Sequence, residues 1–304
     1  MITKSKMKRH SEEYFGEQRD YWWNRDFLEL MAKRWRLDNI GLVLDVGCGI
    51  GHWGQLLASI LPKHSKVIGV DRESDWVDKA QVRAKNLGLD KRYSYKKGDA
   101  QNLPFKDNHF DLVTCQTVLM HVKDPKAVLK EMLRVLKPKG LLMVAEPNNL
   151  ASAMVKSNVD AKWPIQIILD TVKFQLICDK GKQALGEGSN SVGDFVPGYF
   201  SELGLEQIQV YISDKAWPLY PPYKSKEQQV ILKQSLEWLE RDFWIWDKED
   251  TKRFFMAGDG TEKEFKEFWS RAMKYNKIYK QAYKQKNFSS GGGGMTYLVS
   301  GRKP

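Results

Sequence analysis

The sequence predicts an α/β fold built on a parallel sheet. Three observations support this: short apolar segments recur along the first half of the chain, helical patterns alternate with them, and a glycine-rich turn directly follows the first. Strands that alternate with helices form βαβ units, whose strands are parallel and whose crossovers are right-handed. The predicted strands are Leu42–Val46, Lys66–Val70, Tyr93–Lys97, Phe110–Cys115 and Gly140–Ala145.

Helical patterns connect these strands and fill much of the remaining chain. The predicted helices of the core are Trp53–Ser59, Trp76–Leu87, Pro125–Leu136 and Pro197–Leu203. The alternation stops after Pro147, and the segment between the last two strands is too long for a structureless loop in a compact domain. We therefore predict an N-terminal helical segment (1–40), an α/β core (41–147), an insertion (148–194), a core helix and strand (195–213), a helical, aromatic-rich cap (214–290) and a last core strand (291–304).

The composition narrows the class of protein. The 304 residues are 42% hydrophobic, enough for a substantial core, and no stretch approaches the roughly 20 apolar residues of a membrane-spanning helix. The N-terminus has no apolar region typical of a secretory signal. The three cysteines, Cys48, Cys115 and Cys178, are widely spaced and odd in number. This favours neither disulfides nor a cysteine zinc site, so we expect a cytoplasmic protein without a metal.

The formal net charge of +11 raises the question of nucleic acid, so its distribution matters. Both signs alternate along most of the chain, as on an ordinary solvated surface. The exception is the C-terminal part, where a run of basic residues contains no acid. These residues are Arg271, Lys274, Lys277, Lys280, Lys284, Lys286, Arg302 and Lys303.

A glycine-rich turn is the strongest local signal. The apolar strand Leu42–Val46 runs directly into Gly47, Gly49 and Gly51, and a helical pattern follows. Glycines allow backbone angles and a close approach to a ligand that a Cβ would prevent. The start of the next helix offers free N–H groups to an anionic group. Glycine turns of this type bind nucleotide cofactors, although a purely structural turn is the alternative.

Two acids follow the next two strands. Asp71 ends the second strand, about 20 residues past the glycines, where a carboxylate can accept hydrogen bonds from both hydroxyls of a ribose. Asp99 follows the third strand, where it can contact the amine of a base. Either acid could instead cap a helix. Because ligands of open α/β sheets bind at the carboxyl ends of the strands, we expect the glycines and both acids to meet at one site.

Five motifs together resemble the class I S-adenosylmethionine-dependent methyltransferases, in particular the small-molecule branch that includes enzymes of ubiquinone and menaquinone biosynthesis. The resemblance implies a Rossmann-like, doubly wound sheet of seven strands, with MTYLVSG (295–301) as an antiparallel last strand. It resumes weakly at VPGYFSELGLEQIQV (196–210). The motifs are DVGCGIG (45–51), GVD (69–71), GDAQNLPF (98–105), FDLVTCQTVLMHV (110–122) and LKEMLRVLKPKGLLMVAEP (129–147).

The same resemblance implies the residues that bind S-adenosylmethionine and its product S-adenosylhomocysteine. The glycine turn is expected to contact the methionine part, the acid after the second strand the ribose, and the residues after the third strand the adenine. The set is Asp45, Gly47, Cys48, Gly49, Asp71, Arg72, Asp99, Ala100 and Gln116.

The chain departs from the family after the second strand, where members carry Asp-x-Ser and this chain has Asp71-Arg72-Glu73-Ser74. Because of this departure, the cofactor contacts of Arg72 and Glu73 need not follow the family pattern. The expected contact of Asp71 with the ribose is unchanged. A nicotinamide dehydrogenase would share the glycine turn but not the segments 98–105 and 137–140.

Methyl transfer from a sulfonium is an in-line displacement, so the enzyme chiefly aligns the acceptor and excludes water. A base is required only when the acceptor carries a proton at neutral pH. His121, just beyond the fourth strand, is the candidate base, with a structural role as the alternative.

Aromatic residues of the N-terminal segment form a candidate lid. The faces of Tyr14 and Trp22 suit a positively charged sulfonium through cation–π contacts. The alternative is ordinary packing of an amphipathic helix on the sheet.

The long insertions and the basic run leave alternatives open. The segment 214–290 either caps the substrate side or serves structure and oligomerisation. The basic run between Arg271 and Lys286 is interleaved with Tyr275, Tyr279 and Tyr283, which suits single-stranded RNA, although the tyrosines also recur at core spacing. A non-catalytic cofactor-binding protein is a third alternative. The sequence Tyr220-Pro221-Pro222-Tyr223 resembles a motif of base-amine methyltransferases, but it does not follow the fourth strand, so we interpret it as a loop.

Overall fold

The computed structural model describes residues 10–154 and 156–304. They divide into two compact units, which are described separately. The sheet unit comprises Trp23–Ser152, Gly186–Lys215 and Gly294–Pro304. The helical unit comprises the described part of Met1–Trp22 together with Ala153–Leu185 and Ala216–Gly293.

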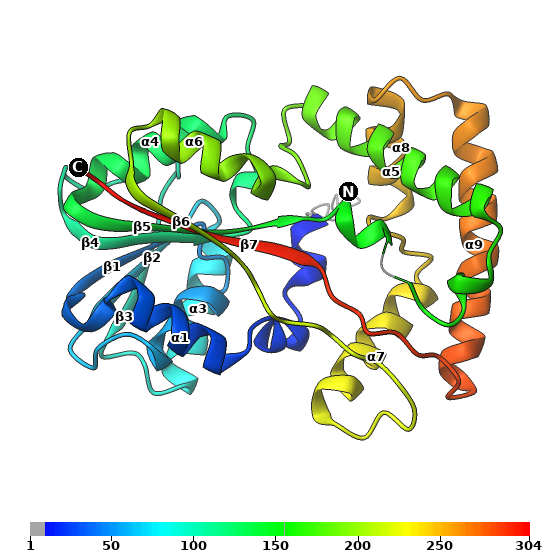
Figure 1. Ribbon diagram of the computed structural model, residues 1–304, viewed down its shortest axis with the longest axis horizontal. Coiled ribbons are helices and arrows are strands. Elements are labelled where there is room, and N and C mark those ends of the chain that lie inside the picture. Colours follow the sequence, from blue (N-terminus) through cyan, green and yellow to red (C-terminus); the bar gives the residue numbers. More distant parts are fainter. Residues whose placement is uncertain (1–9, 155) are drawn as a thin grey trace, which may run out of the picture. The chain divides into compact units, whose positions relative to one another are not determined.

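The sheet unit contains a seven-stranded sheet in the order β3-β2-β1-β4-β5-β7-β6 (Figure 1). Strands β1 to β5 pair in parallel, and β7 is antiparallel to both of its neighbours, β5 and β6. The predicted α/β fold with an antiparallel last strand is confirmed. The bounds are β1 Leu42–Val46, β2 Lys66–Asp71, β3 Tyr93–Lys97, β4 Phe110–Gln116, β5 Leu136–Asn148, β6 Glu206–Ile212 and β7 Met295–Arg302.

Helices cover both faces of this sheet, with α4 and α6 on one face and α1 and α3 on the other (Figure 1). Strands buried on both faces are apolar throughout, which explains the continuous apolar runs in the sequence. Leu44, Val113, Leu142 and Val299 have no exposed surface and form the centre of the core. The helices are α1 Arg25–Trp35, α2 His52–Leu56, α3 Ser74–Asn86, α4 Pro125–Val135 and α6 Val196–Glu202.

Two predicted elements differ from those observed. The helical pattern of residues 11–40 is broken into short 3₁₀ helices, His10–Tyr14 and Glu17–Tyr21, and the helix α1, because Gly16 and Asn24 adopt extended conformations. Strand β5 is longer than predicted. It begins at Leu136, which pairs with Phe110 across an irregularity, and its last residues pair with β7.

Four long helices form most of the helical unit: α5 Ile165–Ala184, α7 Lys226–Glu240, α8 Lys248–Ala257 and α9 Glu262–Lys284. Side chains cap three of them at their first turn: Ser225 caps α7, Asp247 caps α8 and Thr261 caps α9. Stacked aromatic rings fill the space between the helices. The ring of Phe174 lies 3.6 Å from that of Phe268, centroid to centroid. No described helix is long and apolar enough to cross a membrane.

Glycines set the distance between α5 and α8. A Cβ on Gly181 would lie 1.7 Å from the carbonyl oxygen of Phe254, and a Cβ on Gly258 would lie 2.0 Å from that of Ile177. No side chain fits at either position, because a backbone atom of the other helix occupies the space. The two helices therefore pack backbone against backbone.

The variant Gly181→Ala should lower the free energy of unfolding of the helical unit by about 1–3 kcal/mol, because the added methyl forces the helices apart. Helix propensity alone predicts the opposite sign, since alanine favours a helix over glycine by about 1 kcal/mol. The matched control is Gly198→Ala in α6, where a Cβ has no atom within 4 Å. Thermal unfolding of both variants measures the difference, and a Gly181→Ala protein as stable as the wild type would contradict the packing argument.

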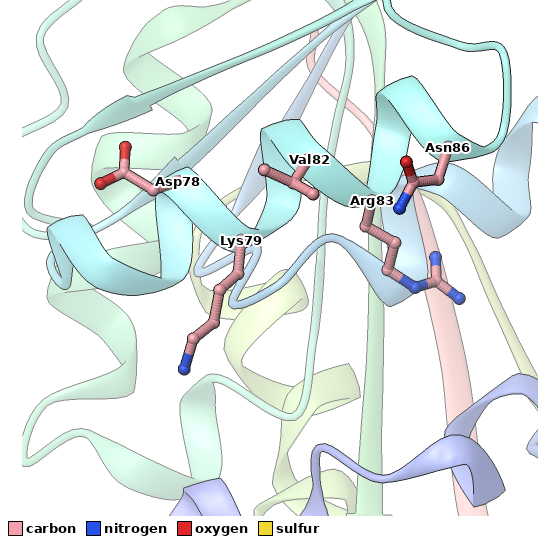
Figure 2. Close-up of a pocket in the computed structure, with 5 residues that line it drawn as sticks. All are labelled: Asp78, Lys79, Val82, Arg83 and Asn86. Atoms are coloured by element: carbon pink, nitrogen blue, oxygen red, sulfur yellow. The ribbon is translucent and has the colours of Figure 1, made fainter.

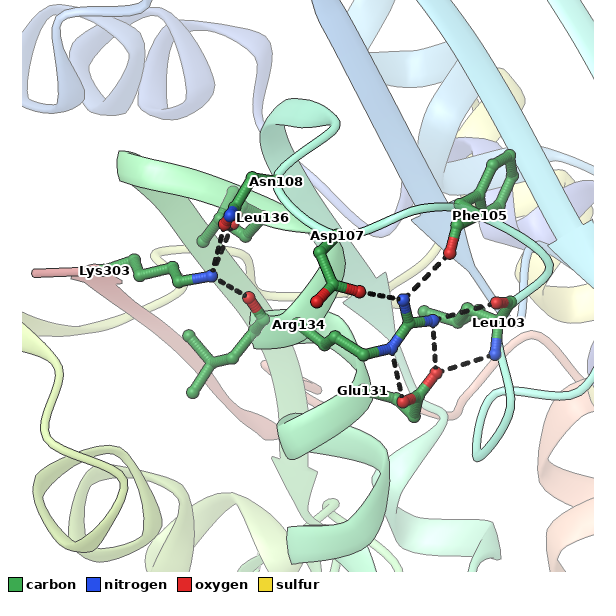
Figure 3. Close-up of polar contacts among 9 residues, drawn as sticks. Leu103, Phe105, Asp107, Asn108, Glu131, Arg134, Leu136 and Lys303 are labelled. Atoms are coloured by element: carbon green, nitrogen blue, oxygen red, sulfur yellow. Dashed lines mark hydrogen bonds and ion pairs between the residues drawn. The ribbon is translucent and has the colours of Figure 1, made fainter.

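Arg134 on α4 holds the loop between β3 and β4 in place (Figure 3). Its guanidinium donates to both carboxylate oxygens of Glu131 and to Asp107, and also to the carbonyls of Leu103 and Phe105. These bonds use all five N–H donors of the arginine. The loop that follows Asp99 therefore has a fixed conformation.

The variant Arg134→Lys should destabilise the sheet unit by about 1–2 kcal/mol. Lysine keeps the positive charge, but its ammonium group cannot make the five hydrogen bonds of the planar guanidinium. Denaturant unfolding followed by circular dichroism measures the loss. The control is Lys130→Arg, on the exposed side of the same helix, which should leave stability unchanged. Equal stability of Arg134→Lys and the wild type would show that the network contributes nothing.

Candidate cofactor site

The carboxyl ends of β1, β2, β3 and β4 meet at one edge of the sheet, where ligands of open α/β sheets bind. Val46 is in register with Val70, and Asp71 is in register with Lys97. The backbone N–H of Gly98 donates to the carbonyl oxygen of Asp71 at 2.9 Å. The structure therefore brings together the segments that the sequence places after these strands.

The glycine turn after β1 adopts left-handed backbone conformations. The φ angles are 64° at Gly47, 52° at Gly49 and 88° at Gly51. The N–H of Cys48 donates to the carbonyl oxygen of Val70 at 3.0 Å, which fixes the turn against β2. Glycine is favoured because a side chain is strained at such angles. The turn therefore closes tightly, with Cys48, Gly49 and Gly51 buried.

Asp71 is buried beside this turn, with 6% of its surface exposed. The N–H of Gly49 donates to Oδ2 at 2.9 Å, and the N–H of Glu73 donates to Oδ1 at 3.0 Å. The N-cap of α3 is Glu73, so the alternative that Asp71 caps this helix is wrong. Each carboxylate oxygen keeps a lone pair, because it accepts only one of these bonds.

Burial raises the pKa of Asp71 above its ordinary value, although the N–H groups of Glu73 and Gly49 and the charge of Arg72 oppose the shift. A buried carboxylate gains more from additional donors than an exposed one does. Two hydroxyl groups of a ribose are donors of this kind. Arg72 itself is exposed, with its Nε 3.4 Å from a carboxylate oxygen of Glu73.

Asp45 in β1 and Cys48 in the turn are both buried within the protein. Asp45 is 1% exposed, and its Oδ2 accepts the N–H of Gly54 at 3.0 Å, which ties β1 to α2. The thiol of Cys48 has a pKa raised well above its ordinary value by burial and by the nearby charges of Asp45 and Asp71. This thiol is therefore unreactive at neutral pH.

Asp99 and Ala100 follow β3 in the loop that Arg134 anchors. The Asp99 side chain is exposed, and its Oδ1 accepts the N–H of Gln101 at 2.9 Å. The hydrogen bond from Gly98 to the carbonyl of Asp71 places the start of this loop directly beside Asp71.

Gln116, the last residue of β4, is buried, and the half-buried His121 follows in the 3₁₀ helix Leu119–His121. Thr117 has a φ of 53°, uncommon for a β-branched residue. Its N–H donates to the carbonyl oxygen of Ala145 at 2.9 Å, which holds this conformation.

Glu146 at the end of β5 is a residue that sequence reasoning missed. It has no exposed surface, and its carboxylate accepts the N–H groups of Val118, Leu119 and Met120 at 2.7, 2.8 and 3.3 Å. It therefore fixes the turn that carries His121. The sequence shows an acid after an apolar segment there, as at Asp71, but it does not show that this acid binds backbone N–H groups.

Tyr14 and Trp22 belong to the helical unit. The hydroxyl of Tyr14 donates to the carbonyl oxygen of Ile245 at 2.7 Å, and its ring lies 5.4 Å from that of Trp238. The guanidinium of Arg19 lies 4.4 Å from the centre of the Trp22 ring. Tyr14 therefore packs against residues of the helical unit, whereas the alternative to the lid had predicted packing on the sheet. The lid remains a prediction, and residues 1–9 of the predicted lid segment lie outside the described residues.

The tyrosines of α9 are used in packing. The rings of Tyr275 and Tyr279 lie 4.0 and 5.6 Å from that of Trp163, and the hydroxyl of Tyr279 donates to Asp160 at 2.8 Å. The loop at residues 220–223 also belongs to the helical unit, where the hydroxyl of Tyr223 donates to the carbonyl of Phe288 at 2.9 Å. The aromatic residues therefore do not alternate with the lysines on one exposed face.

Two surface hollows among the described residues are lined by other parts of the chain, one by α3 and one by residues 156–158, 218, 220 and 289–291. Figure 2 shows a surface hollow whose lining residues all come from α3: Asp78, Lys79, Val82, Arg83 and Asn86. No cluster of histidine, cysteine and acidic side chains suited to a metal occurs among residues 10–154 and 156–304. The carboxyl edge of the sheet is accordingly the candidate site.

The chain is similar to known proteins over the region that contains these segments. Residues 39–187 match the model of a methyltransferase domain family. A demethylmenaquinone methyltransferase of Lactobacillus johnsonii is 33% identical over 134 residues, which cover 44% of this chain and 53% of the relative. A norajmaline N-methyltransferase of Rauvolfia serpentina is 32% identical over 138 residues, 45% of this chain and 47% of the relative. The chain thus spans about half the length of these curated relatives.

The fold is shared more widely. A Bacillus halodurans protein described as a methyltransferase superposes with a TM-score of 0.51 at 20% identity, over 92% of this chain and all of that one (100%). The matched region includes strands β1 to β5, and with them the glycine turn, Asp71 and Asp99. Over residues 39–187, the segment that contains the candidate site, the chain is therefore similar to a methyltransferase domain family.

Proposed function

We propose that this protein transfers a methyl group from S-adenosylmethionine to a small-molecule acceptor. The observation that carries the proposal is the buried carboxylate of Asp71, bonded to the N–H of Gly49 at 2.9 Å and adjacent to the loop of Asp99. Bound S-adenosylmethionine supplies an electrophilic methyl group on a sulfonium. The proposal assigns the binding of its ribose to Asp71 and of its adenine to Asp99 and Ala100.

The other predicted contacts complete this site. We assign the methionine part to the turn formed by Asp45, Gly47, Cys48 and Gly49, and the underside of the cofactor to Gln116. Arg72 flanks the adenine from its exposed position. Tyr14 and Trp22 remain the proposed lid. The left-handed turn supports the assignment, because glycine turns of this kind allow a ligand to approach the backbone closely.

The chain's own residues have a limited chemical task. They hold the acceptor in line with the reacting bond and keep water out, and such alignment can supply on the order of 7–11 kcal/mol of the barrier. His121 accepts a proton if the acceptor carries one at neutral pH. Glu146 acts as a positioning residue in this scheme, because its carboxylate holds the backbone of residues 118–120 next to His121.

The class of acceptor is supported by the named activities of the relatives. One is named for demethylmenaquinone and another for norajmaline, an N-methylation, and both acceptors are small molecules. The two names differ in the acceptor. We therefore propose that the acceptor is a small molecule and do not assign the atom that receives the methyl group. The RNA alternative loses its main support because Tyr275 and Tyr279 pack against Trp163. A cytoplasmic location is supported by three free, buried cysteines.

The variant Asp71→Asn should bind S-adenosylhomocysteine roughly 10- to 100-fold more weakly than the wild type, as measured by calorimetry. The amide keeps the shape but turns one acceptor into a donor, which then faces an N–H of Gly49 or Glu73 and cannot accept a ribose hydroxyl. Asp90→Asn, which removes an exposed charge of the same unit, is the control and should bind normally. Unchanged affinity of a folded Asp71→Asn protein would remove the basis of the proposed function.

The pH dependence gives a second readout of Asp71. Since burial raises its pKa above 3.8, the wild type should lose affinity on acidification at a higher pH than an ordinary aspartate would titrate. Asp71→Asn should show no such loss. The stability of the ligand-free protein should change in the opposite direction to its ligand affinity. A carboxyl group whose pKa is higher in the folded than in the unfolded state stabilises the fold as the pH falls through the folded-state pKa, because the folded state binds the proton more tightly. The wild type should therefore gain stability relative to Asp71→Asn on acidification.

Turnover can be tested with labelled methyl donor and a panel of acceptors that carry phenolic, amine or carbon-acid groups, with RNA included. Label should enter a small molecule and not RNA. If that acceptor is protonated at neutral pH, His121→Gln should lower kcat by about 10²- to 10⁴-fold with little change in S-adenosylhomocysteine affinity. Binding of S-adenosylhomocysteine without transfer to any acceptor class would instead support the non-catalytic alternative.

A further inference from the structure

The segment of residues 186–195, which precedes α6, packs against the ends of two strands of the sheet unit. A Cβ on Gly193 would lie 2.5 Å from the carbonyl oxygen of Glu146 and 2.9 Å from the ring of Tyr297. Glu146 lies near the end of β5, and Tyr297 is its register partner in β7. The absence of a side chain on Gly193 therefore lets the segment lie directly on these strand ends.

The same segment contacts the turn that carries His121. A Cβ on Gly188 would lie 2.4 Å from the carbonyl oxygen of Met120. The turn is in turn bonded to β5, because the carboxylate of Glu146 accepts three of its N–H groups. Strand β4 lies between β1 and β5 in the sheet, so this position adjoins the proposed cofactor site.

Asp194 presents an exposed carboxylate at this position. Nδ2 of Asn148 donates to its Oδ2 at 2.7 Å, and the hydroxyl of Tyr297 also bonds to it, which raises the pKa of Tyr297. Oδ1 of Asn148 accepts the hydroxyl of Ser191 at 2.9 Å, which fixes the amide. Both partners of the carboxylate are neutral, and it forms no ion pair with any residue of the ranges 10–154 and 156–304. Asp194 is thus a held negative charge that can accept further hydrogen bonds.

The surroundings of this carboxylate are acidic, although the whole chain has a net charge of +11. The strand ends and connecting segments that meet here carry three acids, Glu146, Glu187 and Asp194, and no lysine or arginine. Lys123 lies just beyond them, and Lys126 is paired with an acid of α6 at 2.5 Å. The ranges compared are 116–122, 146–152, 186–195 and 294–297.

We propose that the acceptor is a primary or secondary amine, and that its nitrogen is methylated beside Asp194. This inference rests on the proposed function and names the class of acceptor. The carboxylate of Asp194 accepts a hydrogen bond from an N–H of the amine, which leaves the nitrogen lone pair free to face the methyl group. Hydrogen bonds to an ionised carboxylate are roughly twice as strong as those between neutral groups.

The charge movement of this reaction suits an acidic site. An amine that arrives protonated first gives a proton to His121 or to water. The neutral nitrogen then donates its lone pair to the methyl carbon, the carbon–sulfur bond breaks, and its electron pair stays on sulfur. The products are S-adenosylhomocysteine and an N-methylammonium ion, so the positive charge moves from sulfur to nitrogen. A fixed carboxylate beside that nitrogen stabilises the charge as it develops.

Phenols and carbon acids fit these surroundings less well, because they react as anions. Nearby carboxylates repel an anion and raise the pKa of the group that must lose its proton. Transfer to an anion also removes the positive charge of the sulfonium without creating another. Carboxylates at this position would therefore stabilise the reactants more than the transition state.

Matched acceptors of similar size test the class of acceptor. With labelled methyl donor, phenethylamine should be methylated, whereas para-ethylphenol and phenylpropionate should not. Tyramine carries an amine and a phenol on one molecule, so it compares the two groups at equal concentration. Fragmentation of its product by mass spectrometry should place the methyl group on nitrogen.

Substitutions of Asp194 test its part in binding the amine. Asp194→Asn should lower kcat/KM for phenethylamine roughly 10- to 100-fold, because it removes the charge of the acceptor. Calorimetry with S-adenosylhomocysteine should give the wild-type affinity, which shows that the variant folds. Asp194→Glu keeps the charge and should recover part of the loss. The control is Asp90→Asn, which removes an exposed acid before β3, at the opposite edge of the sheet, and should keep the wild-type kcat/KM.

Three results would overturn the inference. They are a methyl group on the oxygen of tyramine, transfer to the phenol but not to the amines, and a wild-type kcat/KM of Asp194→Asn for phenethylamine. Each of them leaves methyl transfer to a small molecule in place. A protein that transfers label to no acceptor would instead contradict the proposed function, and this inference with it.

Discussion

The hydrogen bond from the N–H of Gly49 to the carboxylate of Asp71 is the constraint on which the candidate site depends. It joins the turn after β1 to the end of β2, two segments that approach only because their strands are neighbours in a parallel sheet. The carboxylate is buried and requires donors, and the left-handed conformation of Gly49 aims its N–H at that carboxylate. The shape of the turn and the ionisation of the acid are consequently linked.

The same arrangement, a buried acid that accepts backbone N–H groups, recurs along this edge of the sheet. Asp45 in β1, Asp71 in β2 and Glu146 in β5 are all buried, and each accepts N–H groups from the segment that passes over it. Backbone donors at the start of a helix or turn otherwise lack partners. An acid near the end of each of these strands thus determines the conformation of the segment above it, and the site is built from backbone that these carboxylates hold.

Sequence reasoning predicted the sheet unit well because its signals are local. Apolar strands, glycines and strand-end acids such as Asp71 follow one another in order, and neighbouring parallel strands bring them together. Glu146 was missed because nothing local distinguishes an acid that binds three backbone N–H groups from an acid at a solvated end. The break at Gly16 was also missed, since apolar spacing on both sides of it fits one continuous helix.

The helical unit was less predictable because its geometry depends on contacts between distant segments. Apolar and polar residues are mixed around all sides of α5, and its buried residues include Gln175, Asp179 and Lys182, so periodicity does not tell which face is buried. That choice is made by Gly181, whose missing side chain admits the backbone of α8, and by the stacking of Phe174 on Phe268. Both contacts join residues more than 70 positions apart, beyond the reach of any short pattern.

The position of β7 between β5 and β6 has a consequence for biosynthesis. Strand β6 has β7 as its sheet neighbour and lies at the end of the strand order, so it has no pairing partner until residues 295–302 leave the ribosome. The nascent chain must therefore hold an incomplete sheet while the whole segment 216–293 is translated. Unpaired strand edges of this kind favour aggregation and chaperone binding until β7 inserts between β5 and β6.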